Sequence, residues 1–106
     1  MIDQVLKEIN WSNGRARGKE RQLDQTQEEL AELIQAINKW KRWDKYGEYT
    51  HKEVLQSLIE EIADVKVTVM QMEHLLNLRE EDIDAVMIEK ILEVQKQVEK
   101  EKVVRG

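Results

Sequence analysis

Two short acidic runs have a spacing that suits metal chemistry. The first reads EELAE and the second, further along the chain, reads EEIAD. Residues three apart lie on the same face of a helix, so each run supplies a pair of carboxylates. If the two helices pack antiparallel with these faces together, four like charges converge, and each opposes the ionisation of the others. A hard divalent cation would relieve that cost, and ligation by oxygen alone favours Mg²⁺ or Mn²⁺. The four residues are Glu29, Glu32, Glu61 and Asp64.

Polar side chains continue each acidic pair along its helix face. Facing helices of bundles build metal sites from such inward polar stripes. Glutamates three apart are also common on solvated helix faces, so an ordinary charged surface is the alternative. Small and apolar residues between the acids favour the metal site: Ala31, Ile62 and Ala63. The polar neighbours are Gln22 and Gln25 in the first stripe and Ser57, Thr68 and Gln71 in the second.

Four stretches with apolar residues at helical spacing surround these motifs. The chain has no Pro and only four Gly, so little interrupts a helix. Thr50 and Glu53 match a capping box, and Asn13-Gly14 is typical of a turn. The predicted helices cover residues 1–11, 20–43, 50–77 and 80–103, with a basic loop at 12–18 and a connector at 44–49.

The fold class that follows is all-α: one four-helix bundle-like domain over residues 1–106, whose two long central helices carry the acidic motifs. The helix at 50–77 is apolar on more than one side and so needs cover on more than one side. A chain of 106 residues has a limited core, and it has no Cys to form disulfides. We therefore expect a homo-oligomer, either a homodimer or a homotetramer, with this helix at the subunit interface.

The charge balance narrows the class of partner. A net charge of −5 does not favour a nucleic acid polymer, which attracts basic surfaces, and it disfavours an anionic membrane surface. No stretch approaches the roughly 20 apolar residues that span a bilayer. The first ten residues are amphipathic, unlike a signal peptide. We expect a cytoplasmic protein.

At the acidic motifs the chain resembles the MazG-like all-α nucleotide pyrophosphohydrolases, relatives of the dimeric dUTPases and the dCTP pyrophosphatases. Their hallmark is EExxE on one helix followed by ExxD on a later one. Here these motifs are EELAE, from Glu28 to Glu32, and EIAD, from Glu61 to Asp64. The resemblance covers about residues 22–76 and implies a MazG-type fold.

The resemblance also implies an activity. Such proteins hydrolyse a nucleoside triphosphate, here expected to be a dNTP, between the α and β phosphates, giving the monophosphate and pyrophosphate. Glu29, Glu32, Glu61 and Asp64 would hold one to three Mg²⁺ ions, with Mn²⁺ as a substitute. Glu28, or a carboxylate of the metal site such as Glu61, would orient the attacking water.

Basic and aromatic residues are then expected to contact the substrate. Lys39 and Lys90 are candidates for the phosphates, although the Asn and Arg that follow the family's last-helix lysine are absent after Lys90. Trp11 would stack on the base or simply pack the first helix onto the bundle, and Gln22 is a further candidate contact. The basic loop at 12–18 would close over the triphosphate.

Two other functions fit the same residues. A helical bundle whose acids are merely solvated would act as a structural or interaction protein, indifferent to Mg²⁺. A module that keeps the fold and the metal but lacks catalysis would sense nucleotides without releasing pyrophosphate.

Overall fold

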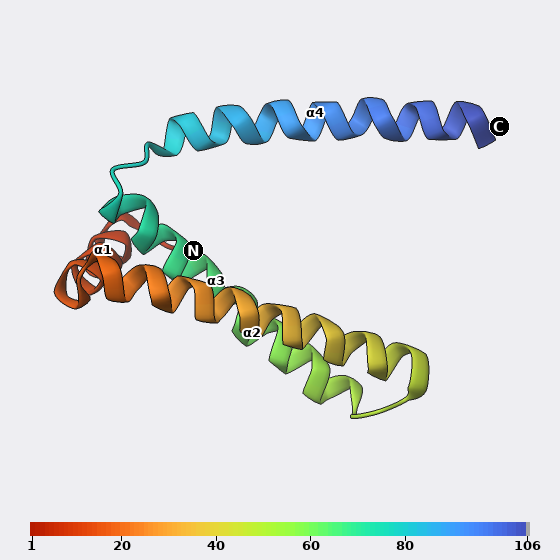
Figure 1. The fold of residues 1–106 in the computed structure, drawn as a ribbon, viewed down its shortest axis with the longest axis horizontal. Coiled ribbons are helices and arrows are strands. Elements are labelled where there is room, and N and C mark those ends of the chain that lie inside the picture. Colours follow the sequence, from red (N-terminus) through yellow and green to blue (C-terminus); the bar gives the residue numbers. More distant parts are fainter. Residues whose placement is uncertain (106) are drawn as a thin grey trace. The chain divides into compact units, whose positions relative to one another are not determined.

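The computed structural model describes residues 1–105, and these form four helices and no strand. The helices are α1 (Gln4–Arg17), α2 (Lys19–Tyr46), α3 (His51–Leu75) and α4 (Glu80–Arg105), shown in Figure 1. The all-α prediction is confirmed. The chain divides into two compact units: Met1–Leu76 contains α1, α2 and α3, and α4 belongs to the unit that begins at Asn77. None of the described helices is long and apolar enough to cross a membrane.

Local signals in the sequence account for the helix ends. The Thr50 Oγ1 atom accepts a hydrogen bond from the Glu53 amide at 3.1 Å, and the Glu53 carboxylate accepts one from the Thr50 amide at 2.9 Å. This is the predicted capping box, and it starts α3. Gly47 ends α2 with a φ of +71°, in the left-handed region that glycine adopts without steric cost.

The predicted basic loop at 12–18 is wrong, because α1 continues through it to Arg17. Gly14 does not make a turn. It is buried where α1 meets α3, and a Cβ atom there would lie 3.2 Å from the Cβ of Gln71. The glycine therefore allows two helices to approach closely. The break comes at Gly18, whose φ is +89°, and Arg15 and Arg17 lie in the last turn of α1 rather than in a loop.

Two other helices end later than predicted. Helix α2 extends from Trp43 to Tyr46, which shortens the connector before α3 to residues 47–50. Helix α4 extends from Val103 to Arg105 because its charged last turns contain no glycine or proline to stop it. The prediction of one domain over residues 1–106 concerns both units and stays a prediction.

Helices α2 and α3 form an antiparallel hairpin that buries polar residues between them. Thr26 Oγ1 lies 2.9 Å from the Gln22 carbonyl oxygen in its own helix and 3.4 Å from the Thr68 carbonyl oxygen in α3. We call the buried residues of this contact the polar seam: Gln22, Thr26, Glu29, Thr68 and Gln71. Helix α1 joins it, because the Gln71 amide donates to Asn10 Oδ1 at 2.7 Å.

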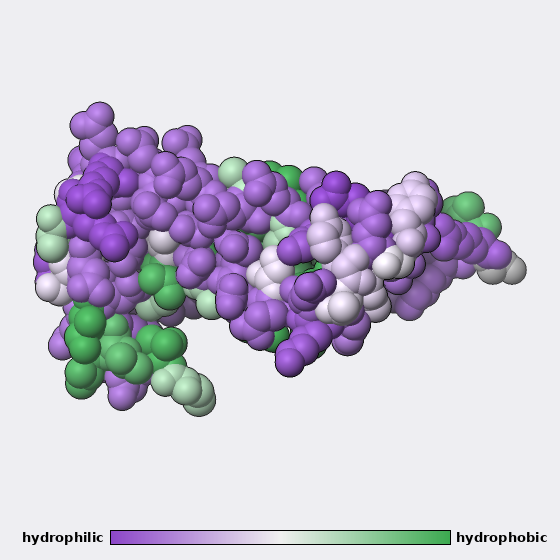
Figure 2. All heavy atoms as spheres, turned by 90° about the horizontal axis from the view of Figure 1, so that it is seen from below, coloured by the Kyte–Doolittle hydropathy of each residue, from purple (hydrophilic) through white to green (hydrophobic). Residues whose placement is uncertain are grey.

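Most large hydrophobic side chains of the described residues are exposed on the surface rather than buried. Among the described residues, Ala36 and Val54 are the buried hydrophobic ones. The predicted apolar stripe of α2 contains Leu30, Ile34 and Ile37, and all three are exposed, Ile34 to 60%. In α3, Leu55, Ile59 and Ile62 are exposed as well. Figure 2 shows hydrophobic side chains on the surface among hydrophilic ones.

Candidate metal centre and adjoining groove

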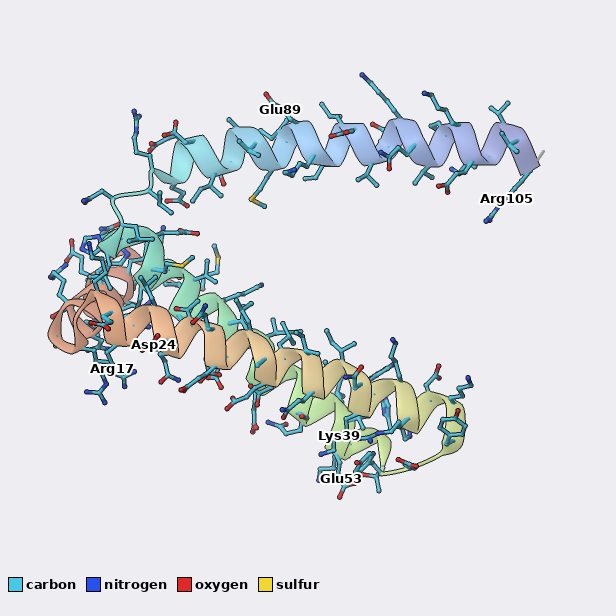
Figure 3. All side chains as sticks on the ribbon, in the orientation of Figure 1. Arg17, Asp24, Lys39, Glu53, Glu89 and Arg105 are labelled. Carbon is cyan, nitrogen blue, oxygen red and sulfur yellow. The ribbon has the colours of Figure 1, made fainter. Side chains whose placement is uncertain are left out.

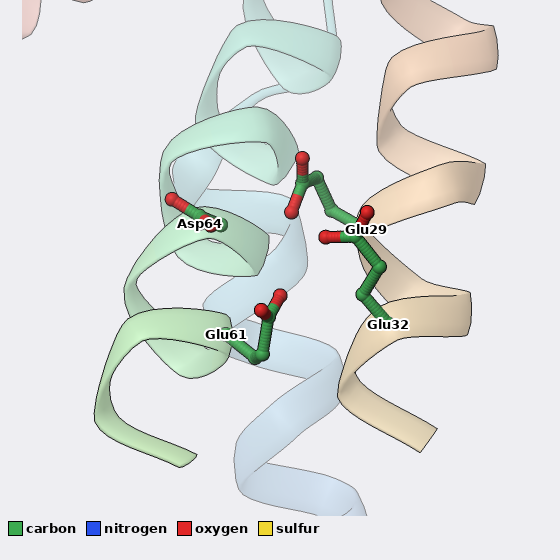
Figure 4. A group of neighbouring side chains, drawn as sticks. All are labelled: Glu29, Glu32, Glu61 and Asp64. Carbon is green, nitrogen blue, oxygen red and sulfur yellow. The ribbon is translucent and has the colours of Figure 1, made fainter. Parts of the chain in front are cut away.

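Four carboxylates from two helices converge at the middle of the α2–α3 hairpin. Glu29 and Glu32 extend from α2, and Glu61 extends toward them from α3 (Figure 4). One carboxylate oxygen from each of Glu29, Glu32, Glu61 and Asp64 lies within 4.8 Å of the others. The two acidic motifs are thus brought together, as the antiparallel packing of their faces requires.

Glu29 is the most enclosed of the four acids. It is 8% exposed and accepts a hydrogen bond from the Gln25 amide at 2.7 Å. Burial raises the pKa of Glu29 above its ordinary value, and the nearby charges of Glu32 and Asp64 act in the same direction. The bond from Gln25 lowers the pKa and offsets part of this rise. A carboxylate placed here needs a positive partner to stay ionised at low cost.

Two oxygen atoms of the group lack a hydrogen-bond partner. The Oε2 atoms of Glu29 and Glu61 are both buried and both unpartnered. An orphaned buried carboxylate oxygen is costly, and a cation is the ligand that satisfies it. These four carboxylates could therefore hold a metal ion.

A groove of about 530 Å³ begins at Glu32 and Glu61 and continues toward the α2–α3 connector. Lys39 lines it, and Figure 3 places Lys39 on α2 at the end of the hairpin where Glu53 starts α3. Arg42 and Tyr49, which were not among the predicted site residues, line the same groove. The positions of the cations in the last turns of α2 are visible in sequence, but the placement of Tyr49 is not.

Tyr49 is held in this groove by two cations. The Arg42 guanidinium donates to the Tyr49 hydroxyl at 3.2 Å, and the Lys39 ammonium lies 4.8 Å from the centre of the tyrosine ring. Arg42 also lies 3.6 Å from a carboxylate oxygen of Glu48. The groove consequently has acidic residues at one end and two basic residues at the other.

Trp11 packs α1 onto α3. Its ring stacks on the His74 ring with centroids 4.9 Å apart and an interplanar angle of 11°. Arg15 Nη1 lies 2.6 Å from His74 Nε2, which ties the same two helices together. This contact matches the packing role considered for Trp11, and base stacking by Trp11 stays a prediction.

Three other predicted site residues are not members of the group of four acids. Glu28 is exposed on α2 and is not in the group. Gln22 is completely buried in the polar seam, and neither atom of its amide has a partner. A substrate could reach Gln22 only if α2 and α3 separated. Lys90 is exposed on α4, in the second unit. The roles of these three residues stay predictions.

Comparisons with known proteins add no assignment. No family model matches the chain, and neither the curated proteins nor the solved structures contain a significant match.

Proposed function

We propose that this chain is a MazG-like, Mg²⁺-dependent nucleoside triphosphate pyrophosphohydrolase, with a dNTP as the expected substrate. The products are the nucleoside monophosphate and pyrophosphate. One observation carries the proposal: oxygens of Glu29, Glu32, Glu61 and Asp64 gather within 4.8 Å. The buried, unpartnered Oε2 atoms of Glu29 and Glu61 supply the independent sign that a ligand is needed there.

The bound metal would neutralise the phosphate charge and align the scissile bond. The chain supplies the rest. Glu29 and Glu32 hold their oxygens on one side of the site, and Glu61 and Asp64 hold theirs on the other. Glu61 also borders the groove, and we assign its carboxylate to accept a proton from the attacking water. The water oxygen forms a bond to the attacked phosphorus as the α–β phosphoanhydride bond breaks, and the bridging oxygen keeps the electron pair and leaves with the other product, so that monophosphate and pyrophosphate are formed.

The same proposal includes self-association. A unit whose buried interior is mostly polar gains little from the hydrophobic effect, while Leu30, Ile34 and Ile59 remain in contact with water. Exposed apolar faces on two neighbouring helices are characteristic of subunit interfaces. A second copy of the chain, in a homodimer or a homotetramer, would cover them.

The direct test measures pyrophosphate and monophosphate released from each NTP and dNTP, with Mg²⁺ or with excess chelator. We expect turnover that requires Mg²⁺ and falls about 100- to 1000-fold in Glu61→Gln, the size of effect seen when a group that stabilises the transition state is lost. The matched control is Glu60→Gln, which changes a neighbouring exposed acid outside the group of four.

The outcomes separate the candidate functions. Equal activity in Glu61→Gln and in Glu60→Gln would remove the acidic group from the chemistry. Mg²⁺-dependent nucleotide binding without product would replace hydrolysis by nucleotide sensing. Indifference to both Mg²⁺ and nucleotides would leave a helical interaction protein.

A further inference from the structure

We propose that Lys39 and Arg42, held by Tyr49, form an anion subsite for the distal phosphates of a polyphosphate substrate. The subsite deepens the proposed function and rests on it for the identity of the substrate. The ligand that it recognises is a chain of at least three phosphates, with or without a nucleoside, whose one end lies among the carboxylates and whose other end lies at the basic end of the groove.

Charge distribution along the groove is the first support. Glu32 and Glu61 border one end, and Lys39 and Arg42 border the other. Lys39 follows Glu32 by about two helical turns, so both residues lie on the face of α2 that lines the groove. A polyphosphate bridging metal and cations would match this polarity along its length, whereas a single phosphate would contact one end only.

The state of Arg42 is the second support. Its guanidinium has five donors, and the structure pairs it with the Tyr49 hydroxyl and, at 3.6 Å, with Glu48. The side chains of Arg42 and Glu48 are both 53% exposed, and an ion pair in that setting is weak. Phosphate oxygens, which arginine can bind with two parallel hydrogen bonds, would displace Glu48 readily.

The backbone of Tyr49 is the third support. Its φ is +66°, in the left-handed region that a bulky non-glycine residue adopts only at a cost. Such strain is concentrated at functional sites, where the surrounding structure holds it in place. Here it places the tyrosine ring beneath Lys39 and its hydroxyl against Arg42. Tyr49 is therefore a positioning residue: it orders two flexible cations before substrate arrives.

The experiment uses inorganic tripolyphosphate and pyrophosphate as probes, because neither requires knowledge of the base. Titration calorimetry on the full chain in Mg²⁺ measures the affinity for each, with phosphate release monitored to exclude turnover. We expect the wild type to prefer tripolyphosphate. Arg42→Gln and Lys39→Gln should each weaken tripolyphosphate binding roughly 10- to 100-fold, the loss of a charge-assisted hydrogen bond, with little change for pyrophosphate.

Tyr49 is tested by two variants. Tyr49→Phe keeps the ring beneath Lys39 but removes the bond to Arg42, and should weaken tripolyphosphate binding by roughly 3- to 10-fold, the value of a neutral hydrogen bond. Tyr49→Gly removes the ring and relieves the positive φ, so it should lose more affinity while melting at the same or a higher temperature. Lower affinity without lower stability is a result that a purely structural role for Tyr49 does not give.

The chain contains a matched control. Lys45 lies 5.5 Å from the centre of the Tyr46 ring, the same kind of cation–ring pair, but neither residue lines the groove. Lys45→Gln and Tyr46→Phe should therefore leave both affinities unchanged. An equal loss in the control variants would mean that general surface charge attracts the probe, and the subsite would be wrong.

Failure of the subsite and failure of the enzyme give different results. If the wild type hydrolyses nucleotides, but Arg42→Gln and Lys39→Gln keep the full preference for tripolyphosphate, only the subsite is overturned. If these variants lose tripolyphosphate binding but the wild type hydrolyses no nucleotide, the subsite is supported and the proposed enzyme activity is overturned. A wild type that does not prefer tripolyphosphate overturns the subsite whatever the hydrolysis assay gives.

Discussion

The two faces of α2 have opposite characters. The face against α3 buries Gln22, Thr26 and Glu29, whereas elsewhere on the same helix Leu30 and Ile34 are exposed. An ordinary amphipathic helix in a single-chain bundle has the reverse arrangement, with its apolar stripe against its neighbour. The hairpin has therefore buried polar residues and one acid and left large hydrophobic residues exposed.

The buried polar residues and the exposed apolar residues therefore differ in what they contribute to stability. Buried polar and charged groups contribute little net stability and are costly when unpaired. Apolar area removed from water is the main favourable term in folding and association. Under the proposed function, the polar seam would serve the metal site, and the exposed apolar faces of α2 and α3 would be covered by another copy of the chain.

The largest effect is expected on the apolar face. Ile34→Glu places a charge where the proposed subunit contact lies, so the oligomer should dissociate and stability should fall by about 3 kcal/mol or more, because an unpaired charge is costly to bury. Light scattering and thermal unfolding measure the two quantities. Gln27→Glu adds the same charge at an exposed polar position of α2 and should change neither. An unchanged mass and melting temperature in Ile34→Glu would show that this face is solvated.

The next effect concerns Mg²⁺ in the seam. A ligand that binds only the folded state stabilises it by about 2.7 kcal/mol at 100 times its dissociation constant. We expect Mg²⁺ to raise the melting temperature of the wild type by roughly 10 °C or more and to have no effect on Glu29→Gln. Samples without Mg²⁺ and with chelator provide the baseline. Equal Mg²⁺ responses in the two proteins would exclude Glu29 as a ligand.

The pH dependence of the same variant follows from the pKa of Glu29. Because burial raises that pKa in the folded state, the ionised carboxylate destabilises the metal-free protein above its folded pKa. Without metal, Glu29→Gln should therefore be more stable than the wild type at neutral pH. The difference should shrink as the pH falls through the folded pKa, where the wild-type carboxyl becomes neutral.

The smallest effect is expected at the other end of the seam. Both amide atoms of Gln22 are buried without partners, so Gln22→Met, which replaces the amide by an apolar group of similar volume, should stabilise the protein by about 1 kcal/mol. Activity should not change if Gln22 does not contact the substrate. Gln27→Met, at an exposed position, controls for the substitution itself. A loss of activity in Gln22→Met alone would restore Gln22 as a substrate contact.

Much of the site could be predicted because helix periodicity alone places Glu29 with Glu32 and Glu61 with Asp64. The capping box at Thr50 was equally local, and the structure confirms it. Gly14 misled the prediction because its role depends on a partner 57 residues away, Gln71, rather than on its neighbours. Tyr49 was missed because its conformation is unusual for its residue type and depends on contacts with Lys39 and Arg42.

By itself, the sequence determined an all-helical chain, the helix that carries each acidic pair and the apolar residues that need cover, since these follow from spacings of three and four residues. Only the tertiary structure decided that the two acidic faces meet, that Glu29 is enclosed with an unpartnered oxygen, and that the groove ends at Arg42 and Tyr49. The physical reason is that periodicity defines the faces of a helix, whereas the choice of face to bury depends on which surfaces are available to pack against it.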